Sequence, residues 1–519
     1  MSGALDPERV PVVVAAGQCE SRDHSLEPLE LAVLAASEAL DSAPGLRRAI
    51  ERVTMVNVLA RRGGDRPAAD AAARLGLGGA ATETTTIGGS TPQLLVERAA
   101  GQIAAGELSA TLVVGADSVR SGRLRVAGRA VDAGTGGSAG EAGPPDEVYG
   151  TYRQDLSDGE RAAGLLTPLC VYPLFESVLA KRSGRTPAEQ RGEIGRLLAL
   201  FSEVAAGNPH AWFRERLSAE QIATPSADNR LVAEPYTKRM VAFLGGAQAA
   251  ALVVTSLAVA RRLGLEGGAM FVWAAASAED VWYPVERPDL GRAAGLELAL
   301  EAALGAAGTS TDEVSFFDLY SCFPSAVQIA AAAIGLEASD ARPLTVTGGL
   351  PYFGGPGNNY STHAVASMLV AMREASEPSI GLVTAVSWYL TKHTVGIYAT
   401  EPPRSSPFRT ARAARAAARL RTRQEALLET ALPRVSTAFP LLDRATATVD
   451  ASTVLYDREG VPTAAPVIAT LGDGRRVAAA AADGEASAVA GSFLNGARVR
   501  LEPGAGPVSA PTYHIETKE

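Results

Sequence analysis

The stretch Thr82-Glu83-Thr84-Thr85-Thr86-Ile87-Gly88-Gly89-Ser90 ends a run of β-branched residues with a glycine pair. Threonine and isoleucine favour a strand because branched side chains pack well on a pleated surface. Pro92 follows in the first turn of a helix, a position at which its missing N–H leaves no hydrogen bond unmade. We expect this helix to reach about residue 105. The stretch therefore predicts a strand, a glycine turn and a helix in direct succession.

Strands and helices alternate on either side of this stretch. We expect strands at residues 10–16, 53–59 and 111–115, and apolar residues at helical spacing predict a helix at residues 27–40. Regular alternation of this kind favours an α/β fold, in which helices cover the faces of a sheet.

The plan returns later in the chain. Thr345-Val346-Thr347-Gly348-Gly349 predicts another strand that ends in a glycine pair, and a helix at 360–375 and a strand at 380–387 follow it. Any α/β protein contains a single turn of this kind, but two such turns in equivalent places favour a duplicated unit. We therefore predict two similar α/β halves.

The rest of the chain reads as an insertion and a C-terminal extension. Regular periodicity weakens from residue 118 to 240, and after residue 403 an arginine-rich helix leads to short β-like runs with turn signals such as Asn495-Gly496, typical of a small β-barrel. The predicted divisions are an N-terminal half at 1–117 and 241–265, an inserted loop domain at 118–240, a C-terminal half at 266–403, a linker helix at 404–430, an additional β domain at 431–505 and a tail at 506–519.

Composition narrows the functional classes. The net charge of −9 over 519 residues argues against a general nucleic-acid or membrane-surface protein, which needs a basic footprint. No apolar run reaches membrane-spanning length, and three cysteines do not suggest a disulfide framework, so we expect a soluble, cytoplasmic protein without a membrane span. The five histidines show no zinc-like spacing, which predicts no metal site.

Three motifs carry a family resemblance. Gly88-Gly89-Ser90 with Gln93 stands where thiolases have Cys-Gly-Ser-Gly-Leu-Gln, and residues 348–356, Gly-Gly-Leu-Pro-Tyr-Phe-Gly-Gly-Pro, stand where they have a glycine pair followed by Gly-His-Pro. Residues 318–323, Asp-Leu-Tyr-Ser-Cys-Phe, stand where thiolases of sterol carrier proteins have His-Asp-Cys-Phe. Over roughly residues 8–400 the chain resembles the thiolase superfamily, of the acetyl-CoA acetyltransferase-like kind, and its extra β domain resembles the type 1 thiolase-like proteins related to sterol carrier protein thiolase.

This resemblance implies a fold and a ligand. The implied fold is a layered αβαβα body of two halves, with an inserted loop domain and an OB-like C-terminal β-barrel. The implied ligand is coenzyme A or an acyl-CoA thioester, used as a substrate in lipid metabolism, with no tightly bound cofactor. The implied assembly is a homodimer or a monomer.

The chain departs from the thiolase pattern wherever the family does its chemistry. Gly88 takes the position of the nucleophilic cysteine, and Gly355 that of the histidine that activates it. Tyr320 replaces a histidine or asparagine, and Ser387 falls near the second cysteine. Loss of a nucleophile together with its base removes most of the catalysis that such groups provide as a unit. The resemblance to acyltransferases therefore leaves open whether the chain is an enzyme, with the standard cysteine-dependent reaction lost or altered.

The candidate site residues follow from these positions. The candidate catalytic residues are Tyr320, Cys322 and His393. Tyr320 either donates a hydrogen bond to a thioester or fills the space of the missing histidine, Cys322 is either a thiolate or a small buried hydrophobe, and His393, expected just after the last strand, is either an acid–base group or a packing residue. The candidate substrate-binding residues are Gly88, Gly89, Ser90, Gly354, Gly355, Asn358, Ser387, His210 and Trp212.

Three functions stay open at this point. The first is a protein that binds coenzyme A or acyl-CoA thioesters. The second is a non-catalytic binding or scaffold protein of a lipid pathway, which uses its C-terminal domain for a protein partner. The third is a condensing enzyme with relocated catalytic residues. We interpret the arginines between residues 409 and 423 as a solvated helix face in preference to contacts with coenzyme A phosphates. Nucleic acid is a disfavoured partner, because residues 435–505 contain few aromatic residues for base stacking.

Overall fold

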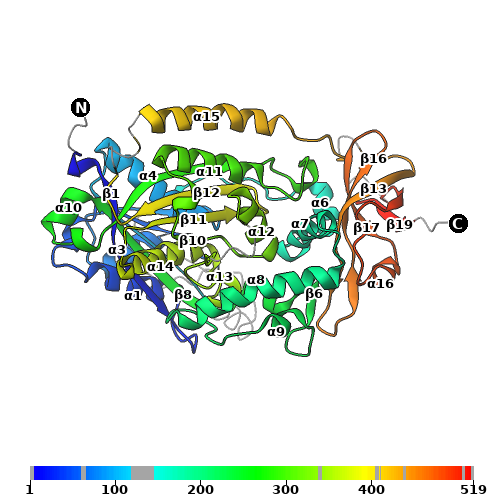
Figure 1. Cartoon of the computed structure of the whole chain (residues 1–519), viewed down its shortest axis with the longest axis horizontal. Helices are drawn as coiled ribbons and strands as arrows, with labels where there is room; N and C mark the ends of the chain where they lie inside the picture. Colours follow the sequence, from blue (N-terminus) through cyan, green and yellow to red (C-terminus); the bar gives the residue numbers. More distant parts are fainter. Residues whose placement is uncertain are drawn as a thin grey trace.

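A ten-stranded sheet forms the body of the protein (Figure 1). The computed structural model describes residues 5–59, 66–118, 145–336, 342–403, 408, 411–436, 440–504 and 509–515. The order of the strands in the sheet is β10-β11-β12-β9-β1-β8-β4-β2-β3-β5. The bounds of these strands are β1 (Pro11–Glu20), β2 (Arg52–Met55), β3 (Ala81–Thr85), β4 (Ala110–Ser118), β5 (Glu147–Tyr149), β8 (Ala247–Ser256), β9 (Met270–Glu279), β10 (Phe316–Asp318), β11 (Ile380–Ser387) and β12 (Lys392–Ala399).

The sheet joins strands from the two parts of the body. β2, β3 and β4 are parallel, and β8 pairs antiparallel with both β4 and β1. A short antiparallel contact, in which Val12 faces Phe271 and Val13 faces Met270, connects β1 to β9. The mixed α/β class predicted from the alternating pattern is therefore confirmed.

Helices pack on the sheet and between its parts. α4 and α14 each contact strands from both parts, among them β8, β1 and β11, whereas α1 contacts β1, β8 and β4, and α11 contacts β9 and β12. α15 lies along the outer side of α11 (Figure 1). The bounds are α1 (Pro28–Leu40), α2 (Leu46–Ala49), α3 (Pro67–Arg74), α4 (Thr91–Ala105), α6 (Asp158–Ala162), α7 (Pro168–Arg182), α8 (Pro187–Gly207), α9 (Ala219–Ala223), α10 (Leu257–Arg262), α11 (Ala294–Ala307), α12 (Pro324–Ala333), α13 (Gly349–Tyr352), α14 (Tyr360–Glu374), α15 (Ala411–Leu428) and α16 (Glu485–Ala488).

Local sequence signals explain where the inserted helices begin. At the start of α8 the Glu189 carboxylate accepts hydrogen bonds from the Thr186 N–H and hydroxyl, both at 2.8 Å, and the Thr186 hydroxyl accepts the Glu189 N–H. This reciprocal cap satisfies two donors that the first turn leaves free, and Pro187 occupies the first helical position. The described part of the insertion, from residue 145 on, contains α6 to α9, and its residues 147–149 add the edge strand β5, which the sequence pattern did not predict.

Two strand predictions in the second part were wrong. Residues 345–348 form an irregular segment with a bend at Val346 and Thr347, and Gly349 begins α13, so no strand forms here. The buried Asp318 carboxylate accepts hydrogen bonds from the Thr345 hydroxyl and from the Thr347 N–H and hydroxyl, at 2.9–3.1 Å, which replace ladder bonds. The chain also continues past residue 387 into β12, so His393 lies within a strand and not after the last one.

The C-terminal region contains a closed five-stranded barrel with the order β13-β16-β17-β19-β18. Its apolar core includes Val449, Val467, Leu501 and Tyr513, all buried. The strand β19 lies in the stretch that we expected to be a tail, and its pairing with β17 and β18 closes the barrel. The bounds are β13 (Ala445–Ser452), β16 (Val467–Leu471), β17 (Arg476–Ala481), β18 (Arg498–Glu502) and β19 (Thr512–Ile515).

A small second sheet ties this region to the insertion. Its order is β15-β14-β6-β7, and Leu455 of β14 pairs with Ala233 of β6. The Ser177 hydroxyl of α7 also accepts hydrogen bonds from the Ser452 N–H and the Asn495 side-chain amide, both at 3.1 Å. The bounds are β6 (Leu231–Ala233), β7 (Tyr236–Thr237), β14 (Leu455–Tyr456) and β15 (Pro462–Ala464).

Candidate functional site

The Gly88-Gly89 pair lies between β3 and α4, with no room for a side chain at either residue. A Cβ atom at Gly88 would lie 2.5 Å from the Ser387 hydroxyl oxygen, and one at Gly89 would lie 2.3 Å from the Tyr320 hydroxyl oxygen. Both distances are shorter than any real Cβ contact. The hydroxyls of Ser387 and Tyr320 therefore fill the space that side chains at residues 88 and 89 would occupy.

Ser90, Ser387 and Asn358 complete a bonded cluster around this pair. The Ser90 N–H donates to the Ser387 hydroxyl at 2.9 Å, and the two serine hydroxyls lie 2.6 Å apart. The Gly88 N–H donates to the Asn358 side-chain oxygen at 3.0 Å, and the Asn358 amide donates to the Asn57 carbonyl at 2.9 Å. Two donors at the start of α4 that would otherwise attract a ligand oxygen are thus bonded within the protein.

The second glycine turn is closed in a similar way. Gly354 has a φ of +113°, and a Cβ atom there would lie 2.2 Å from the Gln248 side-chain oxygen. The Gly355 N–H donates to the Phe243 carbonyl at 2.7 Å, and a Cβ atom at Gly355 would lie 3.1 Å from both that oxygen and the Leu244 side chain. A side chain at Gly355, where the resemblance expects an activating histidine, would therefore lie in close contact with Phe243 and Leu244.

Tyr320 and Cys322 lie next to this cluster in uncharged form. Burial raises the pKa of the Cys322 thiol to about 12, an effect that its hydrogen bond with Tyr172 offsets only in part. Burial also raises the pKa of the Tyr320 hydroxyl well above its ordinary value. At neutral pH Cys322 is a thiol and not the thiolate that nucleophilic attack requires.

His393 belongs to a different set of contacts. Its Nε2 atom lies 2.9 Å from the Leu390 carbonyl, and burial lowers the pKa of its imidazole to about 4. Its Nδ1 atom is buried and has no hydrogen-bond partner among the described residues. Among the described residues, no hydrogen bond or ion pair joins His393 to Tyr320 or Cys322, the other two candidate catalytic residues.

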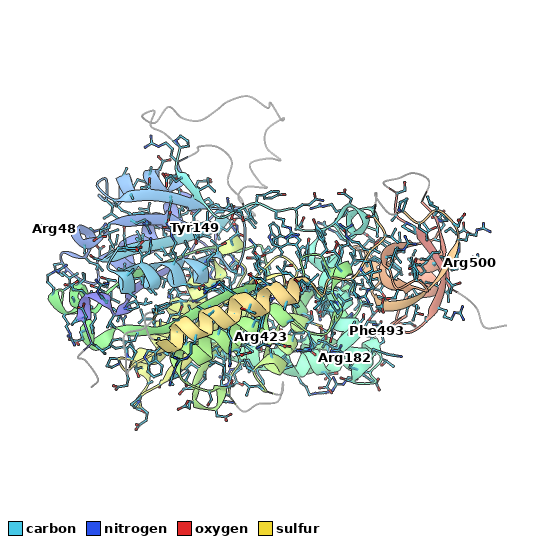
Figure 2. The ribbon with its side chains drawn as sticks, turned by 90° about the horizontal axis from the view of Figure 1, so that it is seen from above. Arg48, Tyr149, Arg182, Arg423, Phe493 and Arg500 are labelled. Atoms are coloured by element: carbon cyan, nitrogen blue, oxygen red, sulfur yellow. The ribbon has the colours of Figure 1, made fainter. Side chains whose placement is uncertain are left out.

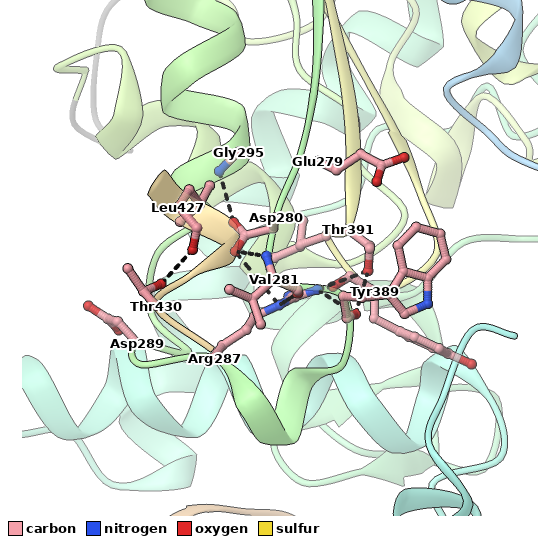
Figure 3. A network of polar contacts seen from close by, with 12 residues as sticks. Glu279, Asp280, Val281, Arg287, Asp289, Gly295, Tyr389, Thr391, Leu427 and Thr430 are labelled. Carbon is pink, nitrogen blue, oxygen red and sulfur yellow. Dashed lines mark hydrogen bonds and ion pairs between the residues drawn. The ribbon is translucent and has the colours of Figure 1, made fainter. Parts of the chain in front are cut away.

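A buried arginine holds the turn between β11 and β12 (Figure 3). Arg287 donates to the Tyr389 carbonyl at 2.7 Å and to the Thr391 hydroxyl at 2.9 Å, and it lies 4.0 Å from the Asp280 carboxylate. In this turn Trp388 and Leu390 have positive φ angles of 59° and 54°, which non-glycine residues rarely adopt. Arg287 thereby positions the segment that begins at Ser387.

An open cavity of about 580 Å³ lies beside the second glycine turn, in the inserted region. The aromatic part of its wall includes Trp212, Phe213, Phe243 and Tyr352. The segment with Trp212 is fixed to the body, because the N–H groups of Trp212 and Phe213 donate to the carbonyls of Phe353 and Tyr352 at 2.8 and 2.9 Å. The further lining residues are Arg214, Glu215, Leu217, Asp228, Lys238, Arg239, Val241, Ala242, Leu244 and Pro351.

Charges of both signs border this cavity. Neither Arg214 nor Lys238 makes a side-chain hydrogen bond or ion pair with the described part of the chain, whereas Arg239 donates to the Gln221 carbonyl at 2.9 Å. The buried Tyr352 hydroxyl also has no partner among the described residues. His210 lies outside the lining, with its Nδ1 atom 3.3 Å from the Glu20 carboxylate.

Metal and membrane features are absent from the described residues. Within these residues, no three histidine, cysteine or acidic side chains gather as metal ligands would, and the three cysteines are free. None of the helices described combines the length and the apolar composition that crossing a bilayer requires.

The fold is that of the thiolases. The dimeric peroxisomal thiolase of Saccharomyces cerevisiae is 16% identical, with a TM-score of 0.56 over 77% of this chain and 99% of its own. Human mitochondrial 3-ketoacyl-CoA thiolase is 13% identical, with a TM-score of 0.55 over 76% of this chain and 99% of its own.

One similar protein matches the extra length as well. The monomeric SCP2-thiolase like protein type 1 (STLP1) from Mycobacterium smegmatis is 29% identical, with a TM-score of 0.80 over 99% of this chain and 100% of its own. The predicted resemblance to the thiolase superfamily, and within it to the type 1 thiolase-like proteins, is therefore confirmed. No protein-family model and no curated protein matches the chain.

The structure brings together part of the predicted site and adds residues that the sequence did not single out. Gly88, Ser90, Asn358 and Ser387 form one cluster, and Tyr320 lies against Gly89. Of the predicted binding residues in the insertion, Trp212 lines the cavity. The cavity residues that were missed come from separate segments of the chain, so no spacing in the sequence indicated them. These missed residues are Phe213, Arg214, Lys238, Phe243, Leu244 and Tyr352.

Proposed function

We propose that this protein binds coenzyme A or an acyl-CoA thioester in the cavity beside Trp212 and does not carry out the cysteine-dependent thiolase reaction. The cavity carries the proposal. Its volume of about 580 Å³ lies within the range of small-molecule sites, roughly 300–1,000 Å³. Relatives named for 3-ketoacyl-CoA and acetyl-CoA chemistry share the fold, which supports this ligand class.

The lining suits the two ends of coenzyme A. Phosphates require cations, and Arg214 and Lys238 border the cavity without a protein partner among the described residues. The pantetheine arm requires apolar walls with a few polar groups, which Phe213, Phe243 and Leu244 supply together with the Tyr352 hydroxyl. Phe213 and Leu244 are 41% and 50% exposed, although both are large hydrophobic residues, and a ligand would cover them.

The reactive end supports binding without the standard reaction. A Cβ atom at residue 88 would overlap the Ser387 hydroxyl, and the position of the activating base is Gly355, which has no side chain. Cys322 is a neutral thiol because burial raises its pKa to about 12. Tyr320, Cys322 and His393 stay predictions as catalytic residues, and none has a base or nucleophile as a described hydrogen-bonding partner.

Four finer expectations accompany this proposal. α4 and α14 touch strands of both parts of the body, which supports the five-layer arrangement, and the closed barrel supports the OB-like assignment. A role in lipid metabolism follows from the proposed ligand, and a cytoplasmic location from the composition.

Isothermal titration with coenzyme A, acetyl-CoA and a longer acyl-CoA tests the proposal. We expect binding that weakens roughly tenfold in the double variant Arg214→Gln/Lys238→Gln, because each lost phosphate contact removes a charge-assisted hydrogen bond. Arg216→Gln is the matched control, since Arg216 is paired with Glu203 and lies outside the lining. No binding of any of the three ligands would refute the proposal, and thiolysis turnover would refute the part that denies the standard reaction.

A further inference from the structure

A basic surface lies on the side of the body opposite the inserted helices. α15 runs along α11 at the top of Figure 1, whereas α8 and α9 of the insertion lie at the bottom. Figure 2 looks onto α15 from above and shows it on the outer surface, with Arg423 on it. A groove of about 280 Å³ between α11 and α15 is lined by Leu298, Glu301, Ala302, Gly305, Arg412, Arg415, Ala416, Arg419, Leu420 and Arg423. We call this the arginine groove.

Four of its arginines form a row along one edge of α15. Arg412, Arg415, Arg419 and Arg423 are separated by three, four and four residues, which places them on one helix face over about 17 Å. The floor beneath the row is aliphatic and contains Leu298, Ala302 and Leu420. The positive charge of this row contrasts with the net charge of −9 of the whole chain.

Half of the row already binds a carboxylate on a helix. The Glu301 carboxylate of α11 pairs with Arg423, and it lies 3.7 Å from the Arg419 guanidinium. Glu301 is the sole acid that lines the groove among the described residues. These contacts show that arginines of the row bind a carboxylate of a neighbouring helix.

The other half of the row lacks such a partner. Arg412 and Arg415 are exposed, and neither pairs with a carboxylate of the described residues. Opposite them lie Gly305 of α11, where a Cβ atom would meet nothing within 4 Å, and Gly308, which follows the end of α11 and lies against the Arg412 guanidinium. The groove is therefore open at the end where its cations are unpaired.

We propose that the arginine groove binds an acidic amphipathic segment of a partner protein, whose carboxylates pair with Arg412 and Arg415. The aliphatic floor favours this occupant over single-stranded nucleic acid, whose bases stack on aromatic side chains, because none of the described residues that line the groove is aromatic. The groove shares no lining residue with the cavity of the inserted region. Pairing of this kind specifies the partner and its register more than it adds affinity.

The probe is a fluorescein-labelled synthetic helix of about 14 residues, which matches the length of the row. It carries glutamates on one face at the spacing of the arginines and leucines beside them, and a second peptide of the same composition has its glutamates moved off that face. Fluorescence anisotropy with the full-length protein should show binding of the first peptide, roughly tenfold tighter than the second. Equal binding of both peptides would overturn the proposal.

Substitutions at the open end give the decisive comparison. Gly305→Glu supplies a carboxylate in place of the partner, so peptide affinity should fall roughly tenfold, whereas Gly305→Gln fills the same space without charge and should change it less than about twofold. Arg412→Gln/Arg415→Gln should weaken binding as Gly305→Glu does. Arg421→Gln, at an exposed arginine of α15 outside the groove, is the control.

Two competing probes complete the test. A labelled single-stranded oligonucleotide and vesicles of anionic phospholipid should bind more weakly than the first peptide, and Gly305→Glu should leave their binding unchanged. Tighter binding of either probe, lost in Gly305→Glu, would overturn the proposal in favour of that occupant. Melting curves of each variant show that the exposed substitutions leave the fold intact.

Discussion

The cluster around Gly88 and the cavity beside the second glycine turn differ in how closely their residues pack. On one side, the cluster around Gly88 is packed so closely that a Cβ atom would lie 2.5 Å from Ser387, and its polar groups are bonded to one another. On the other side, Phe243 and Leu244 border a cavity of about 580 Å³ with unpaired cations at its edge. Packing and internal hydrogen bonds fill the first region, whereas the second has the volume of a small-molecule site. Function in this protein is therefore to be sought where space remains.

The largest effect should come from forcing a side chain into the filled region. Gly88→Ala should lower the free energy of unfolding by about 1–3 kcal/mol, because its Cβ overlaps the Ser387 hydroxyl. The matched control is Gly101→Ala in α4, where a Cβ atom meets nothing within 4 Å and helix propensity raises stability by up to about 1 kcal/mol. Urea unfolding measures both variants.

A double-mutant cycle identifies the partner in that overlap. Ser387→Ala removes the hydroxyl that lies 2.5 Å from the added Cβ, although it also leaves the Ser90 N–H without its acceptor. Gly88→Ala should therefore cost less in the Ser387→Ala background than in the natural chain, with a coupling energy of roughly 1 kcal/mol. A Gly88→Ala variant as stable as Gly101→Ala would show that the region is not filled, and the comparison would fail.

A smaller effect concerns acid. Burial lowers the pKa of His363 to about 3 and that of His393 to about 4, so both are neutral in the folded protein. Between each lowered value and the ordinary pKa near 6.5 the unfolded chain binds more protons, so the free energy of unfolding falls as pH falls, by up to roughly 1.4 kcal/mol per pH unit and histidine. Above pH 6.5 neither histidine contributes a slope.

Buried carboxyl groups act in the opposite direction and have to be separated. Burial raises the pKa of Glu160, Glu176 and Asp318, which makes the folded state bind protons more readily than the unfolded chain. The difference between the natural chain and His393→Asn, measured by urea unfolding from pH 7 to pH 5, isolates the histidine. The variant should have the shallower slope, and identical slopes would mean that folding does not lower the pKa of His393.

The sequence predicted the fold better than the site. Strand and helix periodicity identified α4, α14 and β11, because an element with one buried face has apolar residues at regular spacing. The segment 345–349 escaped this logic, since the buried Asp318 holds it in place and nothing local shows that contact. β12 was missed because the turn after Ser387 uses positive φ at Trp388 and Leu390, where glycine would be the usual signal.

The motif comparison located residues without showing what surrounds them. It identified Gly88 as a missing cysteine, but only the fold shows that Ser387 takes the space and Asn358 takes the N–H. The cavity was harder to foresee, because Phe213, Lys238 and Tyr352 come from three separate segments. Only chain folding brings such residues together, so no spacing in the sequence reveals them.

The smallest predicted effect tests the open region through a single oxygen atom. Tyr352→Phe removes a buried hydroxyl that has no partner among the described residues, so the free energy of unfolding should stay constant or rise by up to about 1 kcal/mol. If a ligand amide or carbonyl supplies the missing partner, the same change should weaken coenzyme A binding by about 1 kcal/mol, or several-fold. Thermal melting measures the first quantity and titration calorimetry the second. The two effects have opposite signs, which a purely structural hydroxyl cannot produce, because loss of a structural hydrogen bond would lower the stability of the free protein. A less stable variant with unchanged affinity would remove Tyr352 from the proposed site and leave the cations and the aromatic wall to hold the ligand.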